Sequence, residues 1–162
     1  PLEGMVGQIY SLSVYDDKLF CAGSNSLGVL DDNEFYIIPN IRGGWWVKSL
    51  RLKDKLLVAT YTGFYILKKV GTRWQVDKKV SGRMYSSKSL YIEPLTNALW
   101  TANKEGGLHR ILLSLDGDSI IKEKCYNFEE LPAGDNVCIN SINLIFDITP
   151  LRINTATQPF LF

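Results

Sequence analysis

Few residues in this sequence could do catalytic chemistry. Its single histidine, His109, lies on an apolar run just after a Gly-Gly pair, with no serine, cysteine or acid at a catalytic-triad or metal-site spacing. A histidine on an ordinary strand is the simpler interpretation. The three cysteines form no CxxC pair, and Cys21 is expected to be a small buried apolar residue. We therefore expect no enzyme, no metal site and no cofactor.

Paired acids are the other candidates for chemistry. Asp16-Asp17, Asp31-Asp32 and the run Asp116 to Ser119 all fall in predicted hairpin turns, where Asp, Asn and Gly bond their own backbone. The run 116–119 could bind calcium weakly, but it lacks the further acidic ligands that calcium uses. Turns are therefore the preferred interpretation of all three.

Aromatic and arginine residues are the better candidates for binding. Flat rings beside arginine donors suit a sugar, because the rings face its C–H groups and the arginines hydrogen-bond its hydroxyls or carboxylates. The candidate ligand-binding residues are Arg42, Trp45, Trp46, Tyr61, Arg83 and Tyr85. The alternative is that Trp45 or Trp46 fills the space between neighbouring sheets, and we expect at least one of them to do so.

Charge is divided unevenly along the chain. Residues 1–41 carry one Lys or Arg and six acids, residues 42–88 carry twelve and two, and residues 89–162 carry five and nine. The basic segment could attract an anionic polymer such as an acidic glycan or nucleic acid. Alternatively, Lys68, Lys69 and the pair Lys78-Lys79 decorate outer strands, where lysine discourages edge-to-edge aggregation. We expect a glycan fragment or other small ligand, and no nucleic acid.

The elements that position these residues repeat along the chain. The run from Leu19 to Leu30 aligns without gaps on Leu56 to Leu67, and with one insertion on Leu99 to Ile111. A weaker copy runs from Leu151 to Phe162. A Ser-apolar-x-apolar motif precedes each copy, beginning at Ser11, Ser49, Ser89 and Ser141.

Each repeat is predicted to form four short strands. Apolar runs such as Leu19–Ala22 and Leu56–Ala59 lack clean alternation, which indicates sheets covered on both faces. Four antiparallel strands in about forty residues predict an all-β fold of β-propeller blades. A sandwich or barrel with accidental self-similarity is the alternative. The 162 residues would form a single propeller segment of three and a half to four sheets, with repeats at 5–41, 42–82, 83–127 and, incomplete, 128–162.

Strand direction brings certain loops together. In a four-stranded antiparallel sheet, the connection to the next sheet and the turn between the second and third strands emerge at the same end. This end should carry residues 39–46, 61–62, 83–87, 104–105 and 128–138. The predicted ligand-binding residues all fall within these segments.

The repeat resembles that of the regulator propellers of bacterial hybrid two-component sensors, known from Bacteroides-like bacteria. Leu99-Trp100-Thr101-Ala102-Asn103, followed by Gly106-Gly107-Leu108, is the best copy, whereas Leu56–Thr60 lacks the tryptophan. The last copy has Arg152 and Gln158 at the tryptophan and glycine columns. This resemblance implies a non-enzymatic, periplasmic sensor domain, often dimeric, in a membrane-anchored receptor whose ligands tend to be glycan fragments.

An arc of blades leaves two apolar sheet faces uncovered. We therefore expect the chain to be part of a larger propeller, completed by the remaining blades or by a homodimer, with a closed four-bladed ring as the alternative. Two other functions stay open. The propeller could be a scaffold for protein–protein interaction, or a lyase or glycosidase in which His109, Tyr61 or Tyr85 serves as acid or base.

Overall fold

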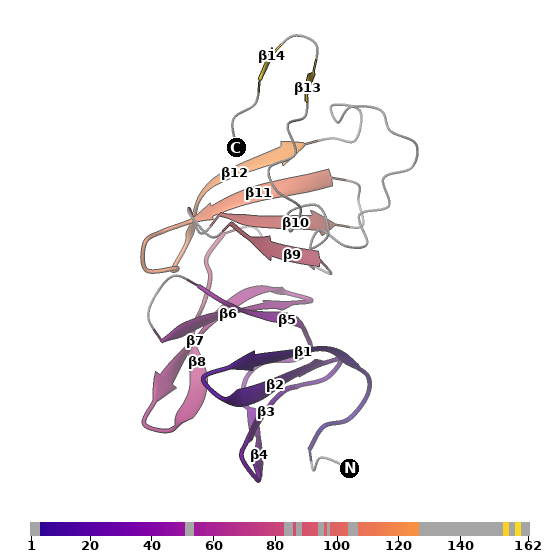
Figure 1. Ribbon diagram of the computed structural model, residues 1–162, viewed down its shortest axis with the longest axis vertical. Coiled ribbons are helices and arrows are strands. Elements are labelled where there is room, and N and C mark those ends of the chain that lie inside the picture. Colours follow the sequence, from indigo (N-terminus) through magenta and orange to yellow (C-terminus); the bar gives the residue numbers. More distant parts are fainter. Residues whose placement is uncertain are drawn as a thin grey trace.

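A computed structural model of the chain contains three four-stranded antiparallel sheets (Figure 1). It describes residues 4–50, 54–82, 86, 89–93, 96, 98–103, 107–126, 154–155 and 158–159. Sheet 1 consists of β1 (Ile9–Tyr15), β2 (Lys18–Gly23), β3 (Leu27–Asp31) and β4 (Glu34–Ile38). Sheet 2 consists of β5 (Gly44–Ser49), β6 (Lys55–Thr60), β7 (Gly63–Val70) and β8 (Arg73–Lys79). Sheet 3 consists of β9 (Ser89–Ile92), β10 (Leu99–Asn103), β11 (Gly107–Leu113) and β12 (Ile120–Tyr126). A two-stranded pair follows, β13 (Asn154–Thr155) and β14 (Gln158–Pro159).

The predicted all-β class is confirmed, since none of the described residues is helical. The apolar runs that begin at Leu19, Leu56 and Leu99 are the second strands of the three sheets. The fourth strand expected in each repeat is present in the three sheets as β4, β8 and β12. Most of the last predicted repeat lies outside the described residues, and the predicted repeat bounds stay predictions.

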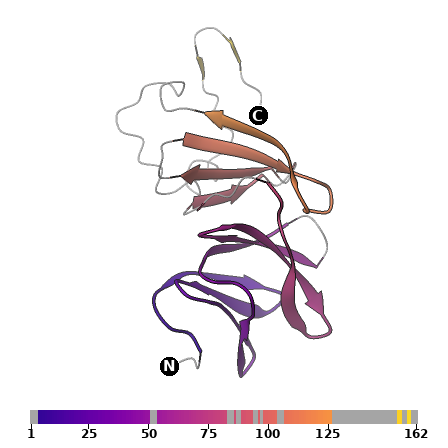
Figure 2. The ribbon, with the colours of Figure 1, turned by 180° about the vertical axis from the view of Figure 1, so that it is seen from behind.

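Each sheet is a simple meander whose strands follow chain order. The first strands of consecutive sheets, β1 with β5 and β5 with β9, are in contact. In Figure 1 these first strands lie close together, whereas the fourth strands, β4, β8 and β12, lie at the outer edges of their sheets. Figure 2 shows from behind that the sheets follow one another in series. This arrangement is consistent with propeller-like blades.

The acidic residues lie in or next to hairpin turns: Asp16-Asp17 and the run 116–119 occupy turns as predicted, whereas Asp31 ends β3 and only Asp32 of its pair lies in the loop. Tyr15 pairs with Lys18, which leaves Asp16 and Asp17 as a two-residue loop with φ angles of 54° and 57°. Two consecutive positive φ angles define the hairpin turn whose twist matches that of the strands, and Asp tolerates them. In the β11–β12 turn, Asp116 accepts hydrogen bonds from the Ser114 hydroxyl at 2.7 Å and the Asp118 amide at 3.3 Å.

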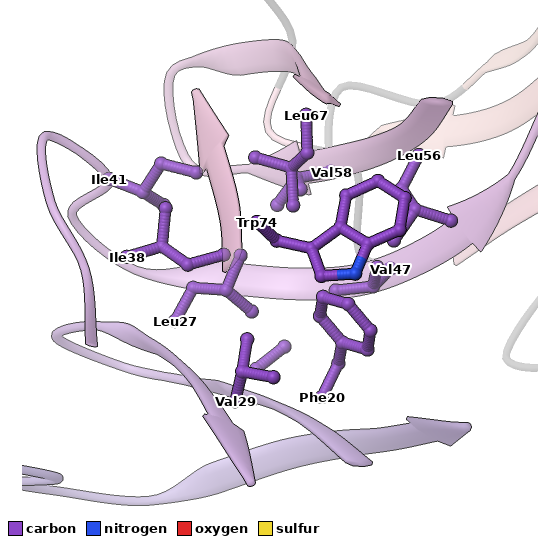
Figure 3. Packing of buried hydrophobic residues seen from close by; sticks show 11 residues of the cluster. Phe20, Leu27, Val29, Ile38, Ile41, Val47, Leu56, Val58, Leu67 and Trp74 are labelled. Atoms are coloured by element: carbon purple, nitrogen blue, oxygen red, sulfur yellow. The ribbon is translucent and has the colours of Figure 1, made fainter. Parts of the chain in front are cut away.

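A first hydrophobic cluster fills the space between sheets 1 and 2 (Figure 3). The Trp74 ring meets Phe20 edge-on at a centroid distance of 5.8 Å, and it meets Tyr15 in the same way at 5.5 Å. The buried members of this cluster are Phe20, Ala22, Leu27, Val29, Ile38, Ile41, Val47, Leu56, Val58, Leu67 and Trp74. The two sheets therefore share one core.

A second cluster joins sheets 2 and 3, and β6 contributes to both clusters. Leu56 and Val58 face sheet 1, while Leu57 and Ala59 belong to the second cluster, and none of the four is exposed. Since alternate residues of a strand point to opposite faces, sheet 2 is covered on both sides. This confirms what the unbroken apolar run predicted. A sandwich of two facing sheets would cover only one face of each.

The strand pairing corrects one part of the sequence alignment. Ser11 pairs with Ala22, and Ser89 pairs with Ala102, so these two serines are equivalent. Ser49 instead pairs with Leu56, and the residue opposite Ala59 is Trp46. The motif in the second repeat is therefore three residues out of register. The reason lies in packing, because this position in sheet 2 faces the second cluster, and Trp46 packs there.

Truncation of β6 tests the two-sided burial of sheet 2. We expect Leu56→Ala and Leu57→Ala each to lower the free energy of unfolding by about 2–5 kcal/mol, because each leaves a cavity in a different core. Val70→Ala is the matched control, because Val70 is 45% exposed and its truncation should change stability by less than about 0.5 kcal/mol. Urea unfolding measures all three. A Leu57 variant as stable as the control would show that one face of sheet 2 is not covered.

Candidate functional site

Several loops meet at one end of sheets 1 and 2, here called the loop end. The start of β1, the β2–β3 turn, the β4–β5 connection and the β6–β7 turn all lie there, as alternating strand direction requires. The contacts agree: Gly43, in the β4–β5 connection, packs against the Tyr61 ring and the Ser24 carbonyl. The Trp45 Nε1 also donates to the Ser86 hydroxyl at 3.3 Å, which links this end to the segment between sheets 2 and 3.

Three aromatic side chains gather at the loop end, and we call them the aromatic cluster: Tyr10, Trp45 and Tyr61. The Trp45 ring lies 4.4 Å from Tyr10 and 4.7 Å from Tyr61, measured between centroids. The Tyr61 hydroxyl donates to the Tyr10 hydroxyl at 2.8 Å. Tyr61 is 38% exposed, and the other two members are partly buried. The cluster is thus a built surface that solvent can reach.

Two β-bulges place the first two members of this cluster. In β1 the pairing skips Tyr10, since Ile9 opposes Gly23 and Ser11 opposes Ala22. In β5 it skips Trp45 in the same way, between Gly44 and Trp46. A bulge releases one residue from the ladder and re-aims its side chain. Tyr10 and Trp45 therefore occupy equivalent positions in neighbouring sheets, which is why their rings meet.

Gly43 allows the third ring to close on the site. Its φ is +69°, which disfavours other residues, and a Cβ placed there would lie 2.3 Å from the Tyr61 ring and 2.7 Å from the Ser24 carbonyl. Only a glycine lets the β4–β5 connection pass beneath Tyr61. The sequence predicted a loop at residues 39–46, but it did not show why position 43 must be glycine.

The environment of Tyr61 changes its acidity. Burial, and secondly the hydrogen bond to Tyr10, raise the pKa of Tyr61 to about 12. The hydroxyl is therefore a neutral hydrogen-bond donor across the ordinary pH range.

The structure brings together only part of the predicted site. Trp45 and Tyr61 are in contact, as predicted, although Trp45 lies within β5 and not in a loop. Trp46 packs against the second cluster, with the Lys48 ammonium 5.4 Å from its ring centroid. It thus fills the space between sheets, which is the alternative that the sequence left open. Arg42 is exposed on the β4–β5 connection.

Two predicted residues lie outside the described part of the chain, Arg83 and Tyr85. Tyr10 was not predicted as a site residue, because the prediction considered only loop segments and Tyr10 lies at the start of β1. A signal was available: β1 begins at the end where the β2–β3 turn lies, so its first residues share that end.

Most lysines of the basic sheet 2 are used in ion pairs. Lys69 pairs with Asp16 and Arg73 with Glu34, both in sheet 1. Lys78 pairs with Asp118 next to sheet 3, and Lys68 pairs with Asp77 at 2.7 Å within sheet 2. The Lys79 ammonium lies 5.6 Å from the Tyr65 ring centroid. Lys78 and Lys79 lie on the edge strand β8, as expected, whereas Lys68 and Lys69 lie on β7, which is paired with β6 and β8. Lys69 and Lys78 are matched by acids next to the neighbouring sheets, and Lys68 by an acid of its own sheet.

Two partly buried acids, Glu93 and Glu123, have clear structural partners. Glu93 accepts two hydrogen bonds from Arg110, at 2.8 and 2.9 Å, and one from Trp100 Nε1 at 2.6 Å. Burial alone would raise the pKa of Glu93, but the hydrogen bonds from Arg110, Thr96 and Trp100 outweigh it and lower that pKa. Glu123 bonds His109, which is buried in β11.

Other kinds of site were sought in the same residues. The part of the chain that the structure describes contains no group of three or more His, Cys, Asp or Glu side chains placed to hold a metal ion. Nor do its described residues form a helix long and apolar enough to span a membrane. Cys21 is 1% exposed, and burial raises the pKa of its thiol, as expected for a small core residue.

Comparison with known proteins does not identify a family: no protein-family model and no curated protein matches the chain.

The titration of Tyr61 tests the geometry of the aromatic cluster. Its pKa is 10 in the unfolded chain and about 12 in the folded protein, so folding favours the neutral hydroxyl. The stability gained from this preference is complete below pH 10 and is lost as the pH rises towards 12. We expect the free energy of unfolding to fall less steeply in this interval for Tyr61→Phe than for the parent. Urea unfolding at several pH values measures it, with Tyr15→Phe, at the opposite end of β1, as control. Equal slopes for parent and Tyr61→Phe would contradict the assignment.

Proposed function

We propose that the chain is a ligand-sensing β-propeller segment that binds a glycan fragment at the loop end and performs no chemistry. The aromatic cluster carries this proposal. Its rings are held by equivalent bulges of two sheets and remain accessible to solvent. An apolar ring face with hydroxyl groups at its edge suits a sugar, which has both C–H faces and polar groups.

Arg42 is the basis for an anionic ligand. It is exposed on the β4–β5 connection, three residues before Trp45. No ion pair among the described residues uses it, in contrast to the lysines of β7 and β8. An arginine donor beside aromatic rings suits the carboxylate of an acidic sugar.

The wider assignment rests on the repeat. We infer that the segment belongs to the periplasmic part of a membrane-anchored hybrid two-component receptor, of the regulator-propeller kind. Two observations support this inference. The sheets repeat as consecutive four-stranded meanders, and the Leu99–Asn103 stretch that resembles the family motif is the second strand of its sheet.

Loss of the proposed contacts should weaken binding. We expect Trp45→Ala with Arg42→Ala to reduce the affinity for acidic oligosaccharides roughly thirtyfold or more, because a ring contact and a charge-assisted hydrogen bond are both removed. Isothermal titration calorimetry over a panel of such sugars measures the change. Arg73→Ala removes a cation from the opposite end of sheet 2 and should leave the affinity unchanged.

Two outcomes would contradict this proposal. A lower melting temperature with unchanged binding would place Trp45 and Arg42 in a purely structural role. Cleavage of any of the sugars during the titration would favour the lyase or glycosidase alternative over a sensor.

A second candidate function, protein–protein contact, is favoured by the face of sheet 1 that points away from sheet 2. Ile9, Leu12 and Val14 are 47%, 59% and 74% exposed on β1. Leu12 of β1 pairs with Cys21, and the equivalent pair in sheet 2 is Val47 with Val58. Val47 is only 2% exposed, because sheet 1 covers it. The same position in sheet 1 thus lacks the cover that its equivalent has in sheet 2. We propose that a further four-stranded sheet covers it, from the remaining blades or from a second copy of the chain.

The association state tests this exposed face. We expect the 162-residue chain to self-associate at micromolar concentration, because burial of such side chains is worth roughly 1.5–3 kcal/mol each. Leu12→Glu with Val14→Glu should shift it towards monomer, whereas the matched change Val70→Glu on the exposed end of β7 should not. Sedimentation velocity measures the distribution. A well-folded monomeric parent would contradict the proposal.

A further inference from the structure

A thiol, an imidazole and a carboxylate lie in sequence across the two outer strands of sheet 3. His109 of β11 and Cys125 of β12 are directly opposed in the antiparallel ladder. Glu123 lies two residues before Cys125, on the same face of β12. The Cys125 Sγ is 3.8 Å from His109 Nε2, and His109 Nδ1 is 2.8 Å from Glu123 Oε1.

The two ring nitrogens of His109 have different partners, which sets their roles. A carboxylate accepts hydrogen bonds, so Nδ1 carries the proton that is donated to Glu123. Nε2 then presents its lone pair to the Cys125 thiol. His109 is 4% exposed, so its ring is fixed by packing, whereas Cys125 is exposed. A base that is oriented by an acid and directed at a nucleophile is the arrangement that activates cysteine in unrelated proteins.

We propose that Cys125 is a reactive thiol and a site of mixed-disulfide formation with low-molecular-weight disulfides. The Cys125 proton passes to His109 Nε2, and the thiolate attacks one sulfur of the disulfide. A new S–S bond forms at Cys125 while the original S–S bond breaks. The departing thiolate takes this proton from His109 and leaves as a free thiol, so His109 is neutral again while Cys125 remains in the mixed disulfide. No net oxidant is consumed beyond the disulfide itself.

Two contrasts within the chain support the assignment. Cys21 is 1% exposed, and burial raises the pKa of its thiol, so it should be inert and serves as an internal control. Glu93, the other well-bonded acid next to sheet 3, instead accepts hydrogen bonds from Arg110, Trp100 and Thr96, which is a structural role. Among the described residues, only Glu123, His109 and Cys125 align an acid, a histidine and an exposed thiol.

The test uses the full chain carrying Cys138→Ser, so that Cys21 and Cys125 are the remaining thiols. Glutathione disulfide is added at neutral pH, and peptide mapping by mass spectrometry follows each cysteine in time. We expect Cys125 to be modified at least roughly tenfold faster in the native protein than in the urea-unfolded chain, and Cys21 to react only when unfolded. A thiol that is merely exposed would react no faster in the native state than unfolded, and that result would overturn the proposal.

Variants separate activation from exposure. We expect His109→Gln to lower the native rate at Cys125 to that of the unfolded chain, and Glu123→Gln to lower it severalfold. Since His109 is buried, its variant is also checked by circular dichroism. Should it unfold, Glu123→Gln, on the outer strand, decides the matter: an unchanged native rate in a folded Glu123→Gln protein would overturn the role of the acid. Lys124→Gln, on the other face of β12, is the matched control and should leave the rate unchanged.

Discussion

Among the described residues, the sheets are buried mainly against one another. A four-stranded meander of short strands has two apolar faces and no helix within the described residues to cover either. Sheet 2 meets this constraint fully, because Leu56 and Leu57, adjacent on β6, are both unexposed in different clusters. Sheet 1 has one face covered by sheet 2, while its other face exposes Leu12 and Val14. The serial order of the sheets follows from this need for neighbours.

The aromatic cluster depends on the same stacking. Tyr10 and Trp45 belong to different sheets, and their rings are 4.4 Å apart only because β1 and β5 lie in contact. The bulges free both side chains from the ladder, and the turn that carries Tyr61 supplies the third ring. No sheet alone could form this surface. A binding site built in this way lies at the junction between blades, so a ligand there would contact and stabilise two blades at once.

The sequence predicted the elements better than the details that make the site. The apolar runs in β2, β6 and β10 and the shared loop end could be predicted, because strand alternation and direction are simple geometric rules. The bulges at Tyr10 and Trp45 could not, since a bulge depends on how two strands pair and leaves no fixed residue pattern. The shift at Ser49 could not be predicted either, because it depends on the packing of Trp46 between sheets 2 and 3. His109 was correctly expected on a strand, but its alignment with Cys125 depends on the register of β11 and β12, which sequence alone does not determine.

Charge complementarity adds to the contacts between neighbouring sheets. The basic second repeat lies beside the acidic first repeat, and Lys69–Asp16, Arg73–Glu34 and Lys78–Asp118 join it to sheets 1 and 3. Each pair is exposed enough to add little stability, but two basic sheets side by side would repel one another. The ion pairs therefore act mainly on specificity of packing. They also limit the positive charge that is available for binding, so an anionic ligand would be attracted to the loop end, where Arg42 is exposed, more than to the outer strands.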